Sequence, residues 1–194
     1  PNVFGGQVLA QALSAAYNSI TNNRVLHSLH AYFLEAGNLE LPITYFVTIM
    51  RDGGSFSTRR VTAKQGNTTI FILAASFHIK EEGHEHQQDF ENNIKQPEEL
   101  LSWDDMLAQF GDFLPKQTKA FLEIERPIEF KPTTVPNPLD VKDLPPFNDI
   151  WFRVKGKTEN ASLALKQQIL TYISDYNILT ATLHPNASKA NHGN

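Results

Sequence analysis

A glycine-opened helix of small residues, followed directly by a strand, constrains this chain most. Residues 3–13 read VFGGQVLAQAL, and residues 27–34 read HSLHAYFL. Apolar residues recur at three- and four-residue spacing, which predicts a helix over residues 7–20 with one buried face. The residues of that face are Leu9, Ala12, Leu13, Ala16 and Ile20. Because its alanines keep the helix thin, it is suited to lie inside a curled sheet.

Four strand candidates follow the helix. They cover residues 25–34, 43–52, 55–65 and 68–80. Glycine-containing turns precede the last three, and such turns are hairpin signals, so we expect an antiparallel sheet. The run IFILAA at residues 70–75 is apolar throughout, which predicts a central strand buried on both faces.

The organisation changes after the fourth strand. Residues 81–96 are dominated by charged and amide side chains, which indicates a surface loop. Short helices are expected over residues 98–110 and 116–123. Residues 128–130 then begin a connector in which prolines cluster, as in a linker between domains.

A faint internal repeat suggests a second unit. A strand is expected over residues 149–156 and a helix over residues 162–183. Within that helix, residues 175–183 align with residues 5–13, because in both an amide precedes two aliphatic residues and a small-residue stretch. The second helix would lack its sheet and leave an apolar face in water. We therefore expect the parent protein to be longer by roughly half a domain.

Composition excludes several classes of function. The 194 residues include no cysteine, which excludes disulfides, thiol catalysis and zinc–thiolate sites. The net charge of −4 is well mixed, so neither a nucleic-acid footprint nor a polybasic membrane patch is expected. No apolar run approaches the roughly 18 residues that span a membrane. Pro1 is not an initiator methionine, so the N-terminus is expected to be trimmed.

Several motifs together resemble the acyl-CoA thioesterase II family, the double-hotdog acyl-CoA hydrolases of bacteria and peroxisomes. In the first part of the chain they are VFGGQ at residues 3–7, HSLHAYFL at 27–34, RDGGSFSTRRV at 51–61 and ASF at 75–77. Beyond the linker they are PNPL at residues 136–139 and YISDYNIL at 172–179. The resemblance covers essentially the whole chain, and the combination is specific.

The resemblance implies an α+β hotdog fold, in which an antiparallel sheet wraps around a long central helix. It divides the chain into a first hotdog at residues 1–96 that lacks its N-terminal strand, a helical and Pro-rich linker at 97–148, and the start of a second hotdog at 149–194. It implies hydrolysis of fatty acyl-CoA without a metal or redox cofactor, in the bacterial cytoplasm or the peroxisome. Neither nucleic acid nor membrane is an expected partner. A homo-oligomer through sheet edges is expected, because a lone hotdog leaves an edge exposed.

The catalytic candidate is Asp175. The resemblance matches it to the family's carboxylate, near the start of the second domain's central helix, which holds the attacking water together with a Thr (or Ser) and a Gln. Those two positions lie beyond Asn194. The residues alone leave open that Asp175 merely caps a helix. Without cysteine or a Gly-x-Ser-x-Gly elbow, hydrolysis is expected to proceed by direct water attack.

Two alternatives to hydrolysis remain, and the missing partner positions add weight to the first. One is a non-catalytic module that binds acyl-CoA or serves in assembly. The other is a hydratase acting on enoyl-CoA. The first hotdog is expected not to be the catalytic one, because it has no carboxylate at the position that Asp175 occupies in the repeat.

The substrate-binding candidates are Phe4, Gly5, Gly6, Gln7, Tyr32, Phe33, Gly54, Ser55, Phe56 and Arg59. For the aromatic residues core packing is the alternative, and for the two helix-start glycines it is a tight turn. Gln7 is expected to bond to the sheet backbone rather than to substrate.

Arginines 51, 59 and 60 are candidates for the phosphates of CoA, with pairing to Asp52 or Glu35 as the alternative. His27 and His30 are three residues apart on a strand, so their side chains are expected on opposite faces of the sheet and cannot chelate one ion together. One of the two is expected to be buried.

Overall fold

The computed structural model describes residues 2–21, 23–89, 94–135, 142–176 and 178–186. The chain forms two compact units. Unit 1 combines Pro1–His86 with Ala161–Tyr176, and unit 2 combines Gln87–Asn160 with Asn177–Asn194. This grouping does not test the division at residues 96 and 148 expected from the sequence, which stays a prediction.

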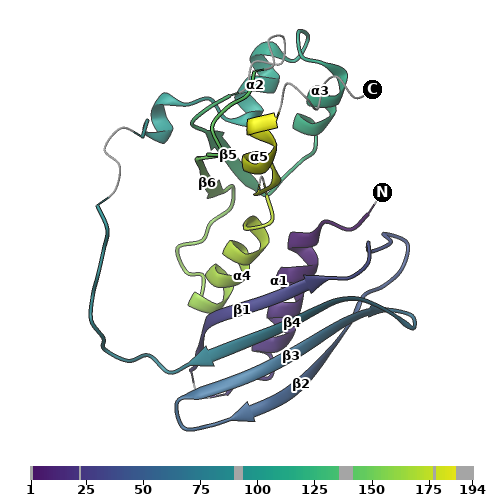
Figure 1. Ribbon diagram of the computed structural model, residues 1–194, viewed down its shortest axis with the longest axis vertical. Coiled ribbons are helices and arrows are strands. Elements are labelled where there is room, and N and C mark those ends of the chain that lie inside the picture. The colour runs from purple at the N-terminus through teal and green to yellow at the C-terminus, as the bar shows by residue number, and fades with distance from the viewer. Residues whose placement is uncertain (1, 22, 90–93, 136–141, 177, 187–194) are drawn as a thin grey trace. The chain divides into compact units, whose positions relative to one another are not determined.

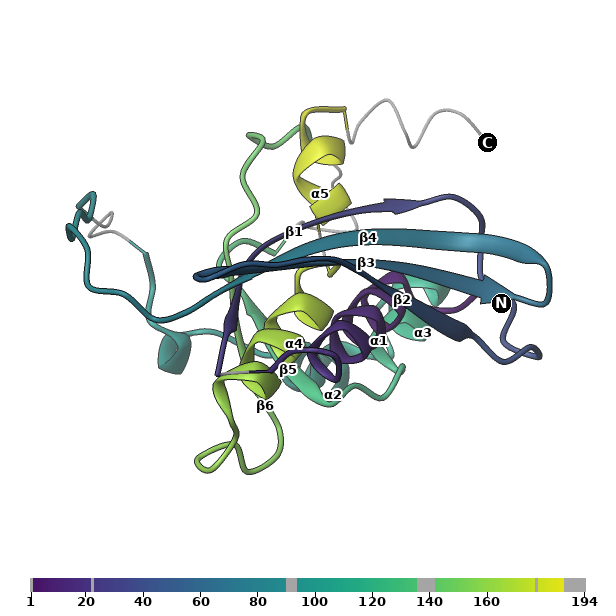
Figure 2. The ribbon, with the colours of Figure 1, turned by 90° about the horizontal axis from the view of Figure 1, so that it is seen from below.

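Unit 1 is an antiparallel sheet packed on two helices. Its strands are β1 (Val25–Phe33), β2 (Thr44–Asp52), β3 (Phe56–Gln65) and β4 (Thr68–His78), in the order β1-β4-β3-β2. All neighbouring strands are antiparallel, and β4 is a central strand, as predicted. The expected burial of β4 on both faces is wrong, because Leu73 and Ala75 are buried on one face while Ala74 is exposed on the other. The helices are α1 (Gly5–Tyr17) and α4 (Leu163–Ile173), which lie side by side (Figures 1 and 2).

The core of unit 1 lies between α1 and the sheet. The predicted helix face is confirmed at four of its five positions, while Ile20 lies beyond the end of the helix and is only partly buried. The buried α1 residues are Gly6, Val8, Leu9, Ala12, Leu13 and Ala16. Strand β3 alternates strictly between buried and less buried positions, as expected for a strand with one face on a core. The sheet residues that meet the helix include Val61, Ala63, Phe71, Leu73, Ala75 and Phe77.

Unit 2 is a smaller mixed assembly. It contains the 3₁₀ turn η1 (Pro97–Glu99), α2 (Trp103–Phe110), α3 (Lys116–Leu122), β5 (Ile128–Pro132), β6 (Ile150–Val154), α5 (Ile178–Leu183) and the 3₁₀ turn η2 (His184–Asn186). Strands β5 and β6 pair antiparallel. Helix α2 begins later than predicted, because Ser102 caps it and forms a capping box with Asp105.

Two sequence expectations for the second half are wrong. The predicted start of the connector at residues 128–130 is strand β5, in which Ile128 and Phe130 are buried and alternate with Glu129 and Lys131. The single helix predicted over residues 162–183 is two helices. Helix α4 stops at Ile173, where the Ser174 hydroxyl donates to the Thr171 carbonyl.

Within the described ranges, no helix is long and apolar enough to cross a membrane.

Candidate functional site

The N-terminus of α1 is capped by a residue far away in the sequence. The N-cap residue Phe4 offers no side-chain hydrogen bond to the first turn. Instead, the Gly6 N–H donates to Asp175 Oδ2 at 2.9 Å. A carboxylate there accepts from an otherwise unpaired N–H and meets the positive end of the helix dipole. Asp175 therefore does cap a helix, but the helix is α1, and Asp175 itself lies in the turn that follows α4 rather than at the start of a helix.

The two glycines that open α1 make this approach possible. A Cβ at Gly5 would lie 2.6 Å from Asp175 Oδ2 and 3.0 Å from the Phe33 ring. A Cβ at Gly6 would lie 2.3 Å from the carbonyl oxygen of Tyr172. Both positions therefore need glycine because α4 and Asp175 come so close, which a tight turn alone would not require.

Asp175 is poised to accept a proton. Burial raises the pKa of its carboxyl above the ordinary value, and the hydrogen bond from the Gly6 N–H offsets part of that rise. A carboxylate with a raised pKa is a stronger base, which suits it to take a proton from water.

An apolar cavity of about 400 Å³ lies beside this carboxylate. Gly5 and Phe33 both line it, and a Cβ at Gly5 would lie close to Phe33 and to Asp175 Oδ2 alike. Its apolar wall is completed by Val8, Leu34 and Ile70. The arrangement combines a base, a helix N-terminus and space for an apolar chain.

Of the two neighbouring aromatic candidates on β1, only Phe33 reaches the cavity. Phe33 pairs with Phe71 in the sheet register, and their ring centroids are 5.0 Å apart. Tyr32, the preceding residue, points to the opposite face of the sheet and is 58% exposed.

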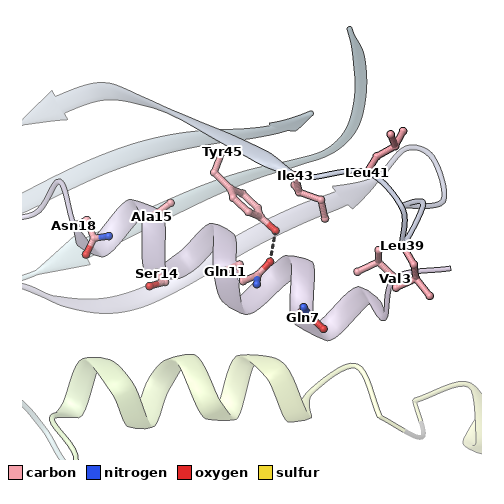
Figure 3. Close-up of a pocket in the computed structure, with 10 residues that line it drawn as sticks. All are labelled: Val3, Gln7, Gln11, Ser14, Ala15, Asn18, Leu39, Leu41, Ile43 and Tyr45. Atoms are coloured by element: carbon pink, nitrogen blue, oxygen red, sulfur yellow. Dashed lines mark hydrogen bonds between the residues drawn. The ribbon is translucent and has the colours of Figure 1, made fainter. Parts of the chain in front are cut away.

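A second groove of about 510 Å³ runs along another side of α1 (Figure 3). Gln7 and Gln11 line it from the helix, and Leu41, Ile43 and Tyr45 line it from β2 and the segment before β2. Tyr45 donates to Gln11 Oε1 at 2.7 Å, and burial raises the pKa of Tyr45 to about 12. No carboxylate or histidine lines this groove, so it lacks a group that could activate water. Gln7 therefore belongs to this groove and not to the Asp175 site.

The remaining substrate-binding candidates lie at the other end of the sheet. Phe56 pairs with His78, whereas Phe33 pairs with Phe71, seven positions along the same strand. At a rise of roughly 3.3 Å per residue, this separates the two ends by about 23 Å. Gly54 and Ser55, in the β2–β3 hairpin, share that far end. The structure thus brings Phe4, Gly5, Gly6 and Phe33 together with Asp175 and leaves the hairpin residues apart.

Arg59 is fully engaged inside unit 1. Its side chain is 1% exposed, and its Nη1 donates to Asp52 Oδ1 at 2.9 Å. Its Nε donates to Ser19 Oγ at 2.8 Å. The hydrogen bond from Arg59, followed by that from Ser57, holds the pKa of Asp52 below its ordinary value. These contacts favour the alternative of pairing with Asp52 and leave Arg59 unable to meet a phosphate.

The two strand histidines differ from expectation. Both are exposed, so the expected buried member is wrong. A β-bulge between Leu26 and Ser28 breaks the alternation on which the opposite-face expectation rested, and His27 Nε2 lies 2.8 Å from Ser76 Oγ. Among the residues that the structure describes, no group of three or more His, Asp or Glu side chains could hold a metal ion.

The aromatic surroundings of Asp175 were missed by sequence reasoning. Tyr172 and Tyr176 flank it, and both contact Phe4. The four-residue spacing of the two tyrosines is visible in the sequence, but Phe4, the ring that both contact, lies near the other end of the chain.

The chain is similar in sequence to known acyl-CoA thioesterases. The profile of the acyl-CoA thioesterase N-terminal domain matches residues 2–78. Acyl-CoA thioesterase 2 of Haemophilus influenzae is 39% identical over 183 residues, covering 94% of this chain and 63% of that protein. Acyl-coenzyme A thioesterase 8 of Homo sapiens is 35% identical over 190 residues, covering 94% of this chain and 59% of that protein.

Solved structures show the same fold. Acyl-CoA thioesterase II TesB2 from Mycobacterium marinum superposes with a TM-score of 0.71 at 27% identity, covering 98% of this chain and 66% of that one. A conserved hotdog-fold protein of unknown function from Alicyclobacillus acidocaldarius superposes with a TM-score of 0.62 at 15% identity, covering 89% and 57%. The latter likeness supports the fold alone.

Unit 1 and these solved structures thus share the hotdog fold, which confirms the α+β hotdog fold expected from the sequence. The chain is similar over almost all of its length to acyl-CoA thioesterases, and residues 2–78 match the N-terminal domain of these enzymes, which confirms the resemblance of its motifs. It spans about three fifths of the length of the curated relatives it matches, 63% and 59% for the two named above.

Proposed function

We propose that this protein hydrolyses fatty acyl-CoA to free fatty acid and CoA. One observation carries the proposal: the Asp175 carboxylate bonds to the Gly6 N–H at the N-terminus of α1, beside an apolar cavity. The names of the relatives, which are acyl-CoA thioesterases, support the same activity.

The proposed reaction is direct attack by water. Asp175 accepts a proton while the water oxygen bonds to the thioester carbonyl carbon. The C–S bond then breaks, the acyl group leaves as a carboxylic acid, and the CoA sulfur takes up the proton. The positive end of α1 stabilises the negative charge that develops on the carbonyl oxygen. In the family that the motifs resemble, a Thr (or Ser) and a Gln complete the water site.

The substrate class follows from the cavity. Val8, Phe33 and Ile70 offer an apolar wall to a straight acyl chain whose thioester lies at Gly5. Phe4 joins the site through Tyr172 and Tyr176 and is not among the residues that line the cavity. No cofactor is part of the proposal, because a carboxylate and water suffice for thioester hydrolysis.

The proposed assembly is a homo-oligomer through sheet edges, with residues 149–194 as the beginning of a second hotdog. Among the described residues, β1 and β2 each have a strand neighbour on one side only. An unpaired edge is a template for pairing with another strand. The bacterial cytoplasm or the peroxisome is the compartment proposed for this activity.

The test is thiol release from medium- and long-chain acyl-CoA, followed with a thiol reagent such as DTNB. Turnover that Asp175→Asn abolishes, while the exposed control Asp112→Asn retains it, supports hydrolysis. Binding of acyl-CoA without thiol release would instead identify the non-catalytic module. Loss of enoyl absorbance without thiol release would identify a hydratase.

A further inference from the structure

Three aromatic rings meet where α1 begins and α4 ends. The Phe4 ring lies 5.2 Å from Tyr172 and 4.4 Å from Tyr176, centroid to centroid. The two tyrosine rings are 5.6 Å apart, and their hydroxyls lie 3.1 Å from each other, within hydrogen-bond distance. The Phe4–Tyr172 contact is edge-to-face, an arrangement that aromatic quadrupoles favour.

These rings sit on both sides of the bond between Gly6 and Asp175. Phe4 is the residue before α1, two positions from Gly6. Tyr176 follows Asp175 directly, and Tyr172 lies on the last turn of α4. The backbone of Tyr172 also approaches Gly6 closely, since a Cβ there would meet its carbonyl oxygen. The residues of the aromatic contact are therefore close neighbours, along the chain, of the two residues that form the capping hydrogen bond.

Asp175 needs such support because its own position in the chain disfavours a carboxylate. It follows the C-terminus of α4, where unpaired carbonyls give the helix end a negative partial charge. A free turn at this point would carry the carboxylate out into water. Only the opposing N-terminus of α1 compensates for that charge, and the compensation requires the two helix ends to stay together.

We propose that Phe4, Tyr172 and Tyr176 form an aromatic clamp that positions the Asp175 carboxylate against the N-terminus of α1. They are positioning residues and take no part in the chemistry. The proposal deepens the proposed function and rests on it where activity is concerned. The contact itself, between the Gly6 N–H and Asp175, can be measured without any substrate.

The clamp also controls how much water reaches the carboxylate. The titratable groups around Asp175 are the hydroxyls of Tyr172 and Tyr176 and the carboxyl of Glu35, which lines the cavity that Gly5 shares. Opening the clamp hydrates Asp175, which lowers the pKa that burial raises. The acid limb of the pH profile should then move to lower pH.

The decisive variants are Phe4→Leu and Tyr176→Leu, with Tyr176→Phe as the conservative substitution that keeps the ring. Phe121→Leu is the matched control, because it removes an edge-to-face contact of the same kind, to Trp103, within unit 2. Amide exchange of Gly6 in the labelled protein reports the capping contact. The pH dependence of kcat/KM reports the carboxylate, and a thermal melt reports folding.

The two leucine variants should speed Gly6 amide exchange at least tenfold, lower kcat about 10- to 100-fold with little change in KM, and shift the acid limb downward. Tyr176→Phe and Phe121→Leu should leave the Gly6 amide exchange, kcat and the acid limb of the pH profile unchanged. If folded Phe4→Leu and Tyr176→Leu proteins keep wild-type Gly6 exchange, the clamp is disproved. If exchange changes but Asp175→Asn still hydrolyses thioesters, the proposed function fails and the clamp stands. Should Phe4→Leu not fold, Tyr176→Leu with Tyr176→Phe decides the matter.

Discussion

Asp175 has a structural role as the cap of α1 and a proposed chemical role as a base, and the two roles place opposite requirements on its carboxyl group. Its partial burial penalises the charged form, while the Gly6 N–H favours it. Burial is the larger effect, so the folded protein holds a carboxylate that binds a proton more readily than the unfolded chain does. Such a group contributes most to stability below the unfolded pKa, and that contribution is lost as pH rises through the folded pKa.

Replacing Asp175 by asparagine should separate the two roles. Asparagine still accepts from the Gly6 N–H but carries no charge to desolvate. We expect thiol release to fall about 10²- to 10⁴-fold, as for loss of a general base, while the melting temperature at pH 7 stays equal or rises. In wild-type protein the raised pKa of Asp175 should make the melting temperature decline as the pH rises between 4 and 8. This decline should be absent in Asp175→Asn. A lower melting temperature at pH 7 in Asp175→Asn, with Asp112→Asn unchanged, would contradict this.

The helix-start glycine gives a second test at this scale. A methyl group at Gly6 would lie 2.3 Å from a backbone oxygen, so α1 and α4 would have to separate. We expect Gly6→Ala to destabilise the protein by about 1–3 kcal/mol, as overpacking does, and to lower activity with it. Urea unfolding measures the first effect and thiol release the second.

Gly54 provides the matched control. A Cβ at that position would meet nothing within 4 Å. Gly54→Ala should therefore change stability by no more than about 0.5 kcal/mol. Equal effects of the two alanines would mean that the close approach of α4 does not explain the glycine at position 6.

At the scale of elements, α1 is anchored at both ends by groups from elsewhere in unit 1. Asp175 holds its beginning, and Arg59 on β3 bonds to Ser19 just past its end. The register of β3 decides which arginine does this. Arg59 falls on the inward face with Ser57 and Val61, whereas Arg60 falls on the outward face.

Arg59→Lys tests the second anchor. A lysine ammonium cannot reproduce the planar set of donors that reaches Asp52 and Ser19 together. We expect a loss of about 1.5–3 kcal/mol, the range for hydrogen bonds to charged groups, while Arg60→Lys is neutral in the same urea titration. The KM for acyl-CoA should be unchanged in folded Arg59→Lys protein. A raised KM would restore the phosphate-binding interpretation.

Elements with local signals could be predicted from the sequence, and those without could not. The four strands follow from glycine turns and alternation, and each was expected within two residues of its observed bounds. Strand β5 was hidden by the prolines around it. The break after Ile173 was hidden because the apolar pattern continues across it. Asp175 was predicted from the family resemblance. Its contact with the start of α1 could not be predicted, because nothing in the sequence around Asp175 indicates that partner.

At the scale of the whole molecule, the sheet of unit 1 is open at both sides. Strand β1 carries Tyr32 and β2 carries Phe46, both more than half exposed. Exposed edges with large apolar side chains favour association. The hotdog units of several copies are therefore expected to pair.

Light scattering should give a mass at least twice the 21.9 kDa of one chain. Tyr32→Lys or Phe46→Lys should shift the protein towards monomer, because lysine on an edge strand opposes pairing. Thr62→Lys places the same charge on the interior strand β3 and is expected to have no effect. A monomeric wild-type protein at working concentration would disprove association through these edges.

The hydrogen bond between the Gly6 N–H and Asp175 also determines when the start of α1 becomes capped during protein synthesis. Gly6 and Asp175 are 169 positions apart. At ribosomal speeds of 5–20 residues per second, about 8 to 34 s pass between their synthesis. Throughout that interval the nascent chain holds α1 with an uncapped beginning, and for most of it α4 has not been made. Protection of the Gly6 amide should therefore appear only in nascent chains from which residue 175 has emerged. The proposed active site is then among the last parts of unit 1 to form during synthesis.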